Sequence, residues 1–464
     1  MLKYFNSIMK FSFVQTFLVA FTLTLSGCSS CERHLADSDN IGDISMPPED
    51  DISQVFPYGI TAKTPPYLTK IESFWYNPSR YRINLRVFQG CPQIERSKNG
   101  RLWAAWIASN EQAERAYIND KNGNRIIPQA DQPSHIGQFG IIATSSDDGK
   151  TWKEVFAFDP REQLGATSSD ILLWKDYEGK IRVVVVRNMC VGDKDLGNTT
   201  AWEFTMQDAD SECPQFSKPR LLGRFNLSVI KPLIFKDGSI LRSGDIFLED
   251  NSPVKTKFVM ENPDGSIRFV SHVNCPNASF AEAALLERKD GSLFTIVRMK
   301  GDVHTAFESF DKGKTWNKIG KMNPEIGIDA KIILGRLASG RVLMVGNDVP
   351  KSGKEKLPWR SKMTAFLSDD DGKTFPHKLL LDERADVSYP SFTQAEDGYI
   401  YIAYDRGRGN KGQHEILMAK ISEDDIIAGK TVSPNSRLKA EISSPSKYGG
   451  GVRDGDKLYA HRQR

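Results

Sequence analysis

The sequence predicts an all-β protein whose fold is a β-propeller of four-stranded blades, six in number. Three observations support this prediction. Glycine-centred turns recur at a repeat length, one turn motif is written three times, and long amphipathic helical segments are missing. The 464 residues suffice for one large repeat domain. A weaker seventh turn at Gly455 leaves a seven-bladed ring, or a closing strand, as the alternative.

The recurring turns share a glycine that is followed by an apolar or β-branched run, such as Val183–Val186. They are centred on Gly100, Gly179, Gly238, Gly291, Gly340 and Gly398. Asp-Gly and Asn-Gly between such runs are strong hairpin signals. A strand-and-turn repeat of roughly 50 to 60 residues is typical of a β-propeller. Two stacked β-sandwiches would need a linker or composition break near the midpoint, and the sequence shows neither.

The repeated turn motif has the pattern S-x-D-x-G-x-T followed by an aromatic residue. Its copies are Ser145–Trp152, Ser309–Trp316 and Ser368–Phe375. The aspartate carboxylate and the two hydroxyls can bond backbone N–H groups within the turn, and glycine supplies a positive φ. We expect the terminal aromatic ring to pack between blades. The motif therefore predicts a structural turn and not a catalytic one.

The first 27 residues have the features of a secretory signal. Lys3 and Lys10 form a positively charged segment, which is followed by an apolar run, Phe11–Leu25. This run is too short and too interrupted for a typical membrane span. The run ends in L-S-G-C, which resembles the bacterial lipoprotein signal and implies that Cys28 is lipidated.

Residues 28–60 begin with the predicted lipidation site, are polar, and are predicted to form a flexible tether. Residues 61–464 form the predicted propeller. The resemblance to a lipoprotein implies a location in the bacterial cell envelope, at the outer membrane, the cell surface or a periplasmic face. Membrane contact is then expected through the lipid alone.

Composition gives no reason to expect nucleic acid, because the net charge is +3 and no basic patch stands out. No cofactor and no metal site are predicted, since the seven histidines are scattered. Export permits disulfides among Cys91, Cys190, Cys213 and Cys275, and Cys190–Cys213 is one candidate pair that spacing alone does not assign. We expect a monomer.

The thrice-written motif is the Asp-box, and with it the chain resembles the sialidase (neuraminidase) superfamily over about residues 65–464. The last third is most similar to the sialidase-like proteins of bacterial glycan-degrading systems. The segments that carry this resemblance are 363–375, 379–384, 387–392, 397–408 and 415–426. The resemblance implies a six-bladed propeller with the Asp-boxes on the outer rim, away from the site.

A sialidase holds the substrate carboxylate with three arginines, attacks the anomeric carbon with a tyrosine activated by a glutamate, and protonates the leaving group with an aspartate. Where the family's first arginine lies in F-R-I-P, this chain reads F-Q-G-C-P, Phe88–Pro92. The nearest arginine is Arg86. This departure weakens the expected carboxylate recognition.

The resemblance nominates catalytic and substrate-binding residues. The catalytic candidates are Tyr389 and Tyr404 as competing nucleophiles, Glu282 as their partner, and Asp131 or His135 as the acid. The substrate-binding candidates are Arg86, Arg298, Arg360 and Arg406, with Arg408 close behind Arg406.

Three functions remain open from the sequence. The leading one is an exo-glycoside hydrolase of sialidase type that removes a terminal, acidic sugar from a glycan. The second is a polysaccharide lyase, in which an arginine or lysine neutralises a uronate carboxylate while a histidine or tyrosine takes a proton. The third is a glycan-binding propeller without catalysis, which the altered F-Q-G-C-P segment favours.

Overall fold

The computed structural model describes residues 73–76, 81–110, 118–119, 125–126, 138–159, 166–189, 200–223, 225–227, 229–246, 256–327, 329–351, 358, 360–408 and 414–448. The chain divides into Met1–Ile41 and Gly42–Arg464, and all described residues belong to the second unit. The predicted signal, Cys28, the tether, Asp131, His135, Cys190 and the Gly455 turn lie outside the described residues. None of the described helices is long and apolar enough to cross a membrane.

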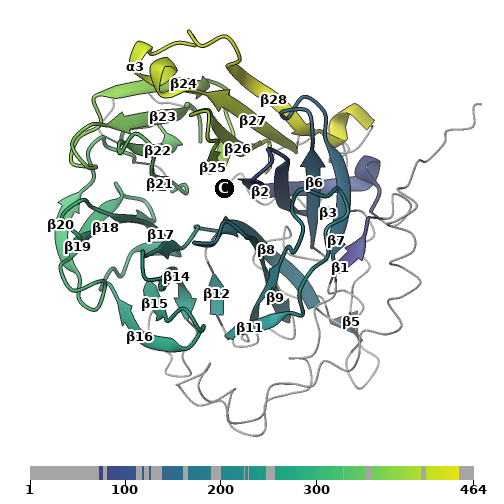
Figure 1. The fold of residues 1–464 in the computed structure, drawn as a ribbon, viewed down its shortest axis with the longest axis horizontal. Coiled ribbons are helices and arrows are strands. Elements are labelled where there is room, and N and C mark those ends of the chain that lie inside the picture. The colour runs from purple at the N-terminus through teal and green to yellow at the C-terminus, as the bar shows by residue number, and fades with distance from the viewer. Residues whose placement is uncertain are drawn as a thin grey trace, which may run out of the picture. The chain divides into compact units, whose positions relative to one another are not determined.

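The described strands form six antiparallel blades around a common axis, as the all-β prediction requires (Figure 1). Blade 1 contains β1 (Ser73–Trp75), β2 (Arg86–Arg96), β3 (Leu102–Asn110), β6 (Phe139–Ser145) and β7 (Lys153–Phe158), in the order β1-β7-β6-β3-β2. Blade 2 contains β8 (Ala166–Lys175), β9 (Ile181–Met189), β10 (Thr200–Thr205) and β11 (Arg220–Gly223). Blade 3 contains β14 (Ile240–Ile246), β15 (Lys257–Glu261) and β16 (Ile267–His272), with β12 (Phe225–Leu227) and β13 (Leu233–Ile234) both paired to β14.

Blades 4 to 6 each consist of four consecutive strands. Blade 4 contains β17 (Ala278–Glu287), β18 (Leu293–Met299), β19 (Thr305–Ser309) and β20 (Asn317–Lys321). Blade 5 contains β21 (Ile333–Arg336), β22 (Val342–Asn347), β23 (Met363–Ser368) and β24 (His377–Asp382). Blade 6 contains β25 (Val387–Gln394), β26 (Ile400–Arg406), β27 (Glu415–Ile421) and β28 (Arg437–Ser443).

The remaining elements are short. They are the hairpin β4 (Ile118–Asn119) and β5 (Arg125–Ile126), the 3₁₀ turns η3 (Ile83–Leu85) and η8 (Pro445–Tyr448), and helix α3 (Glu423–Ala428). Helix α3 begins at a capping box formed by Ser422 and Asp425 and ends at Gly429, which has a φ of 67°.

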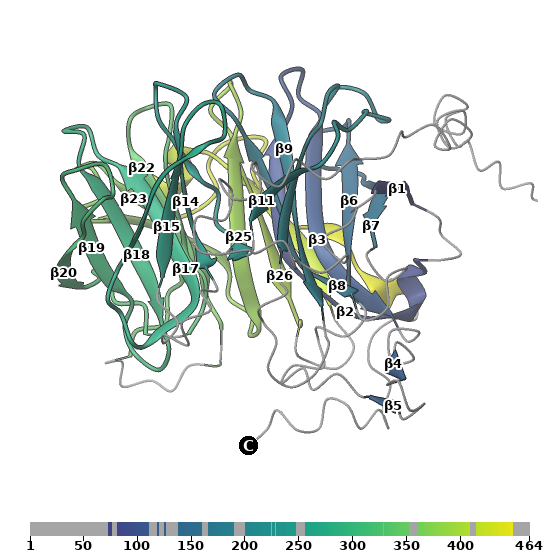
Figure 2. The same ribbon diagram turned by 90° about the horizontal axis from the view of Figure 1, so that it is seen from below.

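The six predicted hairpins join the innermost strand of each blade to the second one. All six of their glycines have a positive φ, between 79° for Gly238 and 101° for Gly100. Residues with a Cβ rarely adopt this conformation, which is why glycine marks each turn. The side view in Figure 2 shows the strands of the blades standing side by side. The inner strands of the blades lie around the axis in Figure 1. Residues at the ends of these strands can therefore come together although they are far apart in sequence.

The three Asp-boxes connect β6 to β7 in blade 1, where β1 is added outside β7, and connect the two outer strands of blades 4 and 5. Their predicted structural role is consistent with this place in the fold. In the first copy, Asp147 accepts bonds from the Thr151 amide (2.9 Å) and the Thr151 hydroxyl (2.6 Å). Ser145 accepts a bond from the amide of Gly149 (2.9 Å). Burial raises the pKa of Asp147, but these bonds outweigh it and lower the pKa to about 2. The turn uses its polar groups internally.

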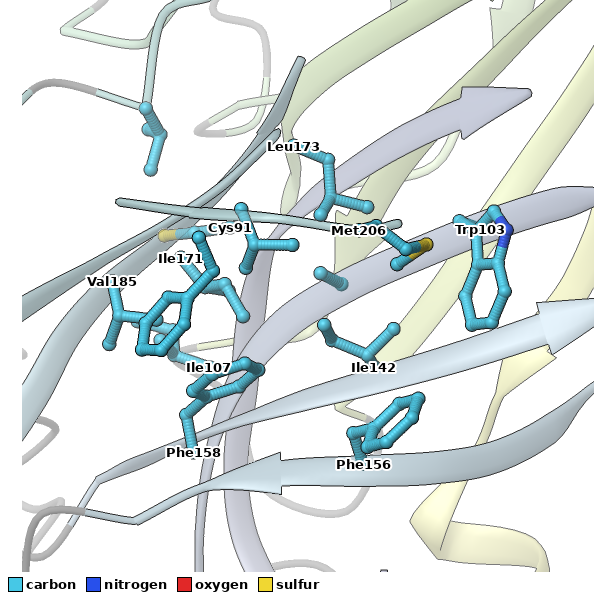
Figure 3. Packing of buried hydrophobic residues seen from close by; sticks show 14 of the residues in the cluster. Cys91, Trp103, Ile107, Ile142, Phe156, Phe158, Ile171, Leu173, Val185 and Met206 are labelled. Carbon is cyan, nitrogen blue, oxygen red and sulfur yellow. The ribbon is translucent and has the colours of Figure 1, made fainter. Parts of the chain in front are cut away.

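The hydrophobic core lies between neighbouring blades. Figure 3 shows the cluster shared by blades 1 and 2, where Trp103 and Phe158 of blade 1 meet Ile171 and Leu173 of blade 2. Each of these side chains is at most slightly exposed. Fully burying one aliphatic side chain of this size stabilises the fold by about 1.5–3 kcal/mol. The alternating apolar residues of each strand thus bind consecutive blades together.

The ring closes where blade 1 meets blade 6, and polar groups of both inner strands cross this seam. Ser391 donates to Gln93 (3.1 Å) and Thr393 donates to Glu95 (3.0 Å). The ammonium of Lys231, which precedes β13, reaches across to Glu95 (2.5 Å) and to the carbonyls of Ile94 and Phe392 (both 2.7 Å). Lys231 therefore ties the third blade to the seam.

Three cysteines fall within the described residues. Cys213 is disulfide-bonded, whereas Cys91 and Cys275 are free and buried. The partner of Cys213 lies outside the described residues, so the Cys190–Cys213 pairing stays a prediction.

Candidate active site

Arg298 is the centre of a cluster that three blades contribute. It is the penultimate residue of β18 in blade 4, and only 1% of its surface is exposed. Its NH1 donates to Glu282 Oε2 of β17 (2.6 Å) and to the Tyr389 hydroxyl of β25 (3.0 Å). Its Nε donates to Asp329 Oδ1, just before β21 (2.5 Å). One guanidinium thus positions a glutamate, a tyrosine and an aspartate.

A second arginine joins this cluster through the backbone of Asp329. The Asp329 carbonyl accepts bonds from Arg298 NH2 (3.1 Å) and from Arg360 NH2 (3.0 Å). Arg360 lies in the connection from β22 to β23, and its NH1 also donates to Ser388 Oγ (3.4 Å). Because both guanidiniums bond the same oxygen, their positive groups are held close together.

Cationic groups surround the ring of Tyr389. The Cζ of Arg408 lies 4.0 Å from the ring centroid, and the Cζ atoms of Arg360 and Arg298 lie 5.5 Å and 5.9 Å from it. The Nζ of Lys331 lies 6.0 Å from the same centroid. These distances are in the range of cation–π contacts. Such a concentration of positive charge at one tyrosine is suited to an anionic ligand.

Register shifts in the pairing of the inner strands orient the side chains of this cluster. The pairing of β25 with β26 shifts register between Ser388 and Ser391, and Tyr389 within the shift has a φ of 54°. The inner strands of blades 1, 2 and 4 shift register in the same way, beside Cys91, Asp170 and Glu282. A bulge re-aims a side chain, and a positive φ at a tyrosine is strained, so both features are typical of functional sites.

Burial and repulsion between like charges act on the basic groups. Burial, and then the charge of Arg408, lowers the pKa of Arg360. Burial also lowers the pKa of Lys331 to about 8, against the opposing effect of Glu282. The ammonium of Lys331 is fully buried and has no hydrogen-bond partner among the described residues. An anion bound here would relieve this repulsion.

Two further groups titrate away from their ordinary values. Desolvation by the surrounding protein is the main cause that raises the pKa of the Asp170 carboxyl to about 8, and the negative charge of Glu282 is the second. Burial, and then Glu282, raises the pKa of the Tyr389 hydroxyl. At neutral pH Asp170 is therefore a protonated acid and Tyr389 a neutral phenol, which are the forms that a proton donor and a resting nucleophile require.

Four sequence-predicted residues come together in this cluster: Glu282, Arg298, Arg360 and Tyr389. The structure places three others elsewhere. The hydroxyl of Tyr404 donates to Asp382 (3.1 Å) within the core shared by blades 5 and 6, and Arg406 pairs with Glu415 (2.7 Å). Arg86 is buried against Glu154 in blade 1 (2.6 Å).

The reason for these displacements is local. Tyr404 and Arg406 lie on β26, the second strand of blade 6. The partner of Tyr404 is Asp382 on β24 of blade 5, and the partner of Arg406 is Glu415 on the adjacent β27. Arg86 begins β2, and its guanidinium pairs with Glu154 of β7 in the same blade. Asp131 and His135 lie outside the described residues, so their predicted roles stay predictions.

Asp170, Asp329 and Lys331 are not among the residues predicted from the sequence, and Arg408 stands out there only as a neighbour of Arg406. No motif marks them. Each depends on contacts between blades that are distant in sequence. The described residues contain no group of three or more His, Cys, Asp or Glu side chains that could hold a metal ion.

The comparisons with known proteins agree with this architecture. The model of the BNR repeat-like domain matches residues 141–402. The chain belongs to this family. No curated protein matches.

Solved structures of low sequence identity share the propeller. The intramolecular trans-sialidase from Ruminococcus gnavus, in complex with oseltamivir carboxylate, matches with a TM-score of 0.53 and 13% identity, over 75% of this chain and 96% of that one. The leech intramolecular trans-sialidase, complexed with 2,7-anhydro-Neu5Ac, matches with a TM-score of 0.51 and 11% identity, over 78% of this chain and 71% of that one.

The chain spans 63% of the Hadza microbial sialidase Hz136, which it matches over 68% of its own length at 15% identity and a TM-score of 0.48. At these identities the likeness concerns the fold. The likeness to the two trans-sialidases, together with the family match and the six described blades, confirms the expected sialidase-like propeller.

Proposed function

We propose that this BNR repeat-like protein is an exo-acting glycoside hydrolase of sialidase type, which removes a terminal acidic sugar from a glycan. The observation that carries the proposal is the shared donor of Arg298, whose NH1 bonds both Glu282 (2.6 Å) and the Tyr389 hydroxyl (3.0 Å). This arrangement supplies a base beside a phenol in a site rich in guanidinium groups. The two trans-sialidases that share the fold support the same class.

In the proposed reaction, the guanidiniums of Arg298 and Arg360 hold the sugar carboxylate. Glu282 takes the phenolic proton, and the Tyr389 oxygen forms a bond to the anomeric carbon while the bond to the leaving oxygen breaks. Asp170 is the candidate among the described residues to protonate that leaving oxygen, and Asp131 and His135 stay candidates for the same role. Water then cleaves the tyrosyl–sugar bond and releases the acidic sugar.

A panel of aryl glycosides tests the proposal. The panel contains an N-acetylneuraminide, a glucuronide, a galacturonide and a neutral galactoside, each with a fluorogenic leaving group. We expect release from an acidic member, and we expect Tyr389→Phe to lower kcat/KM by roughly 1,000-fold or more because the nucleophile is lost. The matched control is Tyr404→Phe, which removes a hydroxyl bonded to Asp382 outside the cluster and should retain activity.

The alternatives predict other outcomes of the same panel. A lyase would leave the aryl glycosides intact and release products with ultraviolet absorbance from a uronate polysaccharide. A glycan-binding propeller would bind acidic sugars and form no product. Turnover of the neutral galactoside alone, or equal losses in Tyr389→Phe and Tyr404→Phe, would contradict the proposed site.

We also propose that Cys28 is lipidated and anchors the protein in the cell envelope. The disulfide at Cys213 supports an oxidising compartment. Metabolic labelling with a radioactive or clickable fatty acid should mark the wild-type protein and leave Cys28→Ser unlabelled. Cys31→Ser is the matched control and should label normally. Equal labelling of wild type and Cys28→Ser would refute this anchor.

A further inference from the structure

Arg408 enters the cluster from an unexpected direction. It lies two residues beyond the end of β26 in blade 6, yet its guanidinium stacks on the Tyr389 ring with Cζ 4.0 Å from the centroid. Its NH1 donates to the Sγ of Cys91 in β2 of blade 1 (2.9 Å). The Arg408 side chain thus crosses the seam between the first and last blades to reach the site.

Gly90 provides the passage. A Cβ on Gly90 would lie 2.3 Å from Cδ and 2.9 Å from Cγ of Arg408, and 2.9 Å from Oδ2 of Asp405. Non-bonded carbon atoms do not approach this closely. Gly90 is not among the glycines with a positive φ, so its backbone would accept another residue. Glycine is therefore required at this position for space, and the space is occupied by Arg408.

The contact of Arg408 with Cys91 is weak and replaceable. A thiol sulfur is a poor hydrogen-bond acceptor compared with a carboxylate. Burial raises the pKa of the Cys91 thiol, so the acceptor is neutral. Asp405 holds the surrounding backbone, because its Oδ2 accepts the Cys91 amide (2.8 Å) and its Oδ1 accepts the Ser388 hydroxyl (2.6 Å). A ligand carboxylate could thus take over the Arg408 donor without disturbing the scaffold.

We propose that Arg408 is an anion-recognition residue of this site, delivered from blade 6 through the gap at Gly90, and that it supplies the guanidinium which the F-Q-G-C-P segment of blade 1 lacks. Its ligand group is the carboxylate of a terminal acidic sugar. The choice of sugar rests on the proposed function, whereas the path of Arg408 through the seam rests on the geometry alone.

A double-mutant cycle tests this inference by isothermal titration calorimetry with N-acetylneuraminate, glucuronate and galacturonate. The variants are Arg408→Met, Gly90→Ala and the double variant. The sugar acid bound most tightly by the wild type is carried forward, with its methyl ester as the uncharged control. We expect Arg408→Met to weaken binding of the acid by roughly 10- to 150-fold, the range for a hydrogen bond to a charged group, and to leave binding of the ester unchanged.

Gly90→Ala should reproduce the loss seen in Arg408→Met, because the new methyl group displaces the arginine. In the Arg408→Met background the same substitution should have a smaller effect, since the flexible methionine can move away from the new methyl group and only the close approach to Asp405 Oδ2 remains. The melting temperature of the double variant should also exceed that of Gly90→Ala. This readout holds even if the Gly90→Ala single variant folds poorly.

The outcomes separate the two proposals. If the wild type binds an acid but Arg408→Met binds it equally well, the assignment of Arg408 is wrong and the proposed function stands. If Gly90→Ala weakens binding as strongly in the Arg408→Met background as in the wild type, the passage is wrong. If the wild type binds the methyl esters and neutral galactose but none of the acids, both the proposed substrate class and the role of Arg408 are overturned.

Discussion

Replacing Arg298 by methionine should be among the costliest single substitutions in the ring. The substitution removes the donor to Glu282, which is 5% exposed, and the donor to Asp329, whose side chain is 20% exposed. Breaking a buried ion pair by removing one partner costs about 3–5 kcal/mol, because the remaining charge is left without compensation. Asp329 can regain part of its solvation from water, so Glu282 accounts for most of this cost.

Equilibrium urea denaturation, followed by intrinsic fluorescence, measures the change in the free energy of unfolding. The matched control is Arg406→Met, which removes the partner of Glu415 from a more accessible pair, with side chains 17% and 19% exposed. Arg384 remains 3.7 Å from Glu415, so we expect a cost of about 1 kcal/mol. Adding Glu282→Gln to Arg298→Met should restore roughly 1–2 kcal/mol by removing the orphaned charge. Equal costs for Arg298→Met and Arg406→Met would refute the buried cluster.

Two further predictions concern the proton donor and the ring seam. Because the pKa of Asp170 is raised to about 8, the acid is protonated below that pH, and kcat/KM on an alkyl glycoside should fall as the pH rises through about 8. Asp170→Asn should abolish this activity but spare an aryl glycoside, whose leaving group needs no proton; equal losses on both substrates would contradict the assignment. Lys231→Met should cost about 2–4 kcal/mol in urea denaturation, because it leaves the carboxylate of Glu95 buried, with Lys175 only 3.8 Å away as partial compensation. Lys378→Met, which breaks the pair of an exposed lysine with Asp348, is the control and should cost less than about 1 kcal/mol; a similar cost for both variants would argue against the seam.

The fold could be predicted because its signals are local. A hairpin glycine such as Gly291, with a φ of 83°, satisfies a backbone requirement that depends on its own turn. The Asp-box likewise satisfies its own donors, as Asp311 does with the amide and hydroxyl of Thr315. Repeated along the chain, such turns predict a propeller before any contact between blades is known, although the weak turn at Gly455 leaves the choice between six and seven blades open.

The site was only partly predictable because it depends on contacts across the seam between blades 1 and 6 and on register shifts in the inner strands. Tyr389 and Tyr404 both looked suitable as nucleophiles, and the sequence left the choice between them open. Only the tertiary structure shows that Tyr389 lies within a register shift of an inner strand, whereas Tyr404 lies in a regularly paired strand with its hydroxyl bonded to Asp382. Arg408 depends on Gly90, which is far away in the chain, so neither residue reveals its role without the other.

The central claim is that Tyr389 forms a covalent bond to an acidic sugar, and mass spectrometry can test it directly. The protein is incubated with a fluorinated sialosyl fluoride, whose glycosyl intermediate hydrolyses slowly, and is then quenched in acid and digested. We predict that the mass of one sugar is added to the peptide that contains Tyr389, and that Tyr389→Phe carries no adduct. An adduct on another residue, or turnover of the sialoside panel member with no adduct at Tyr389, would contradict the account.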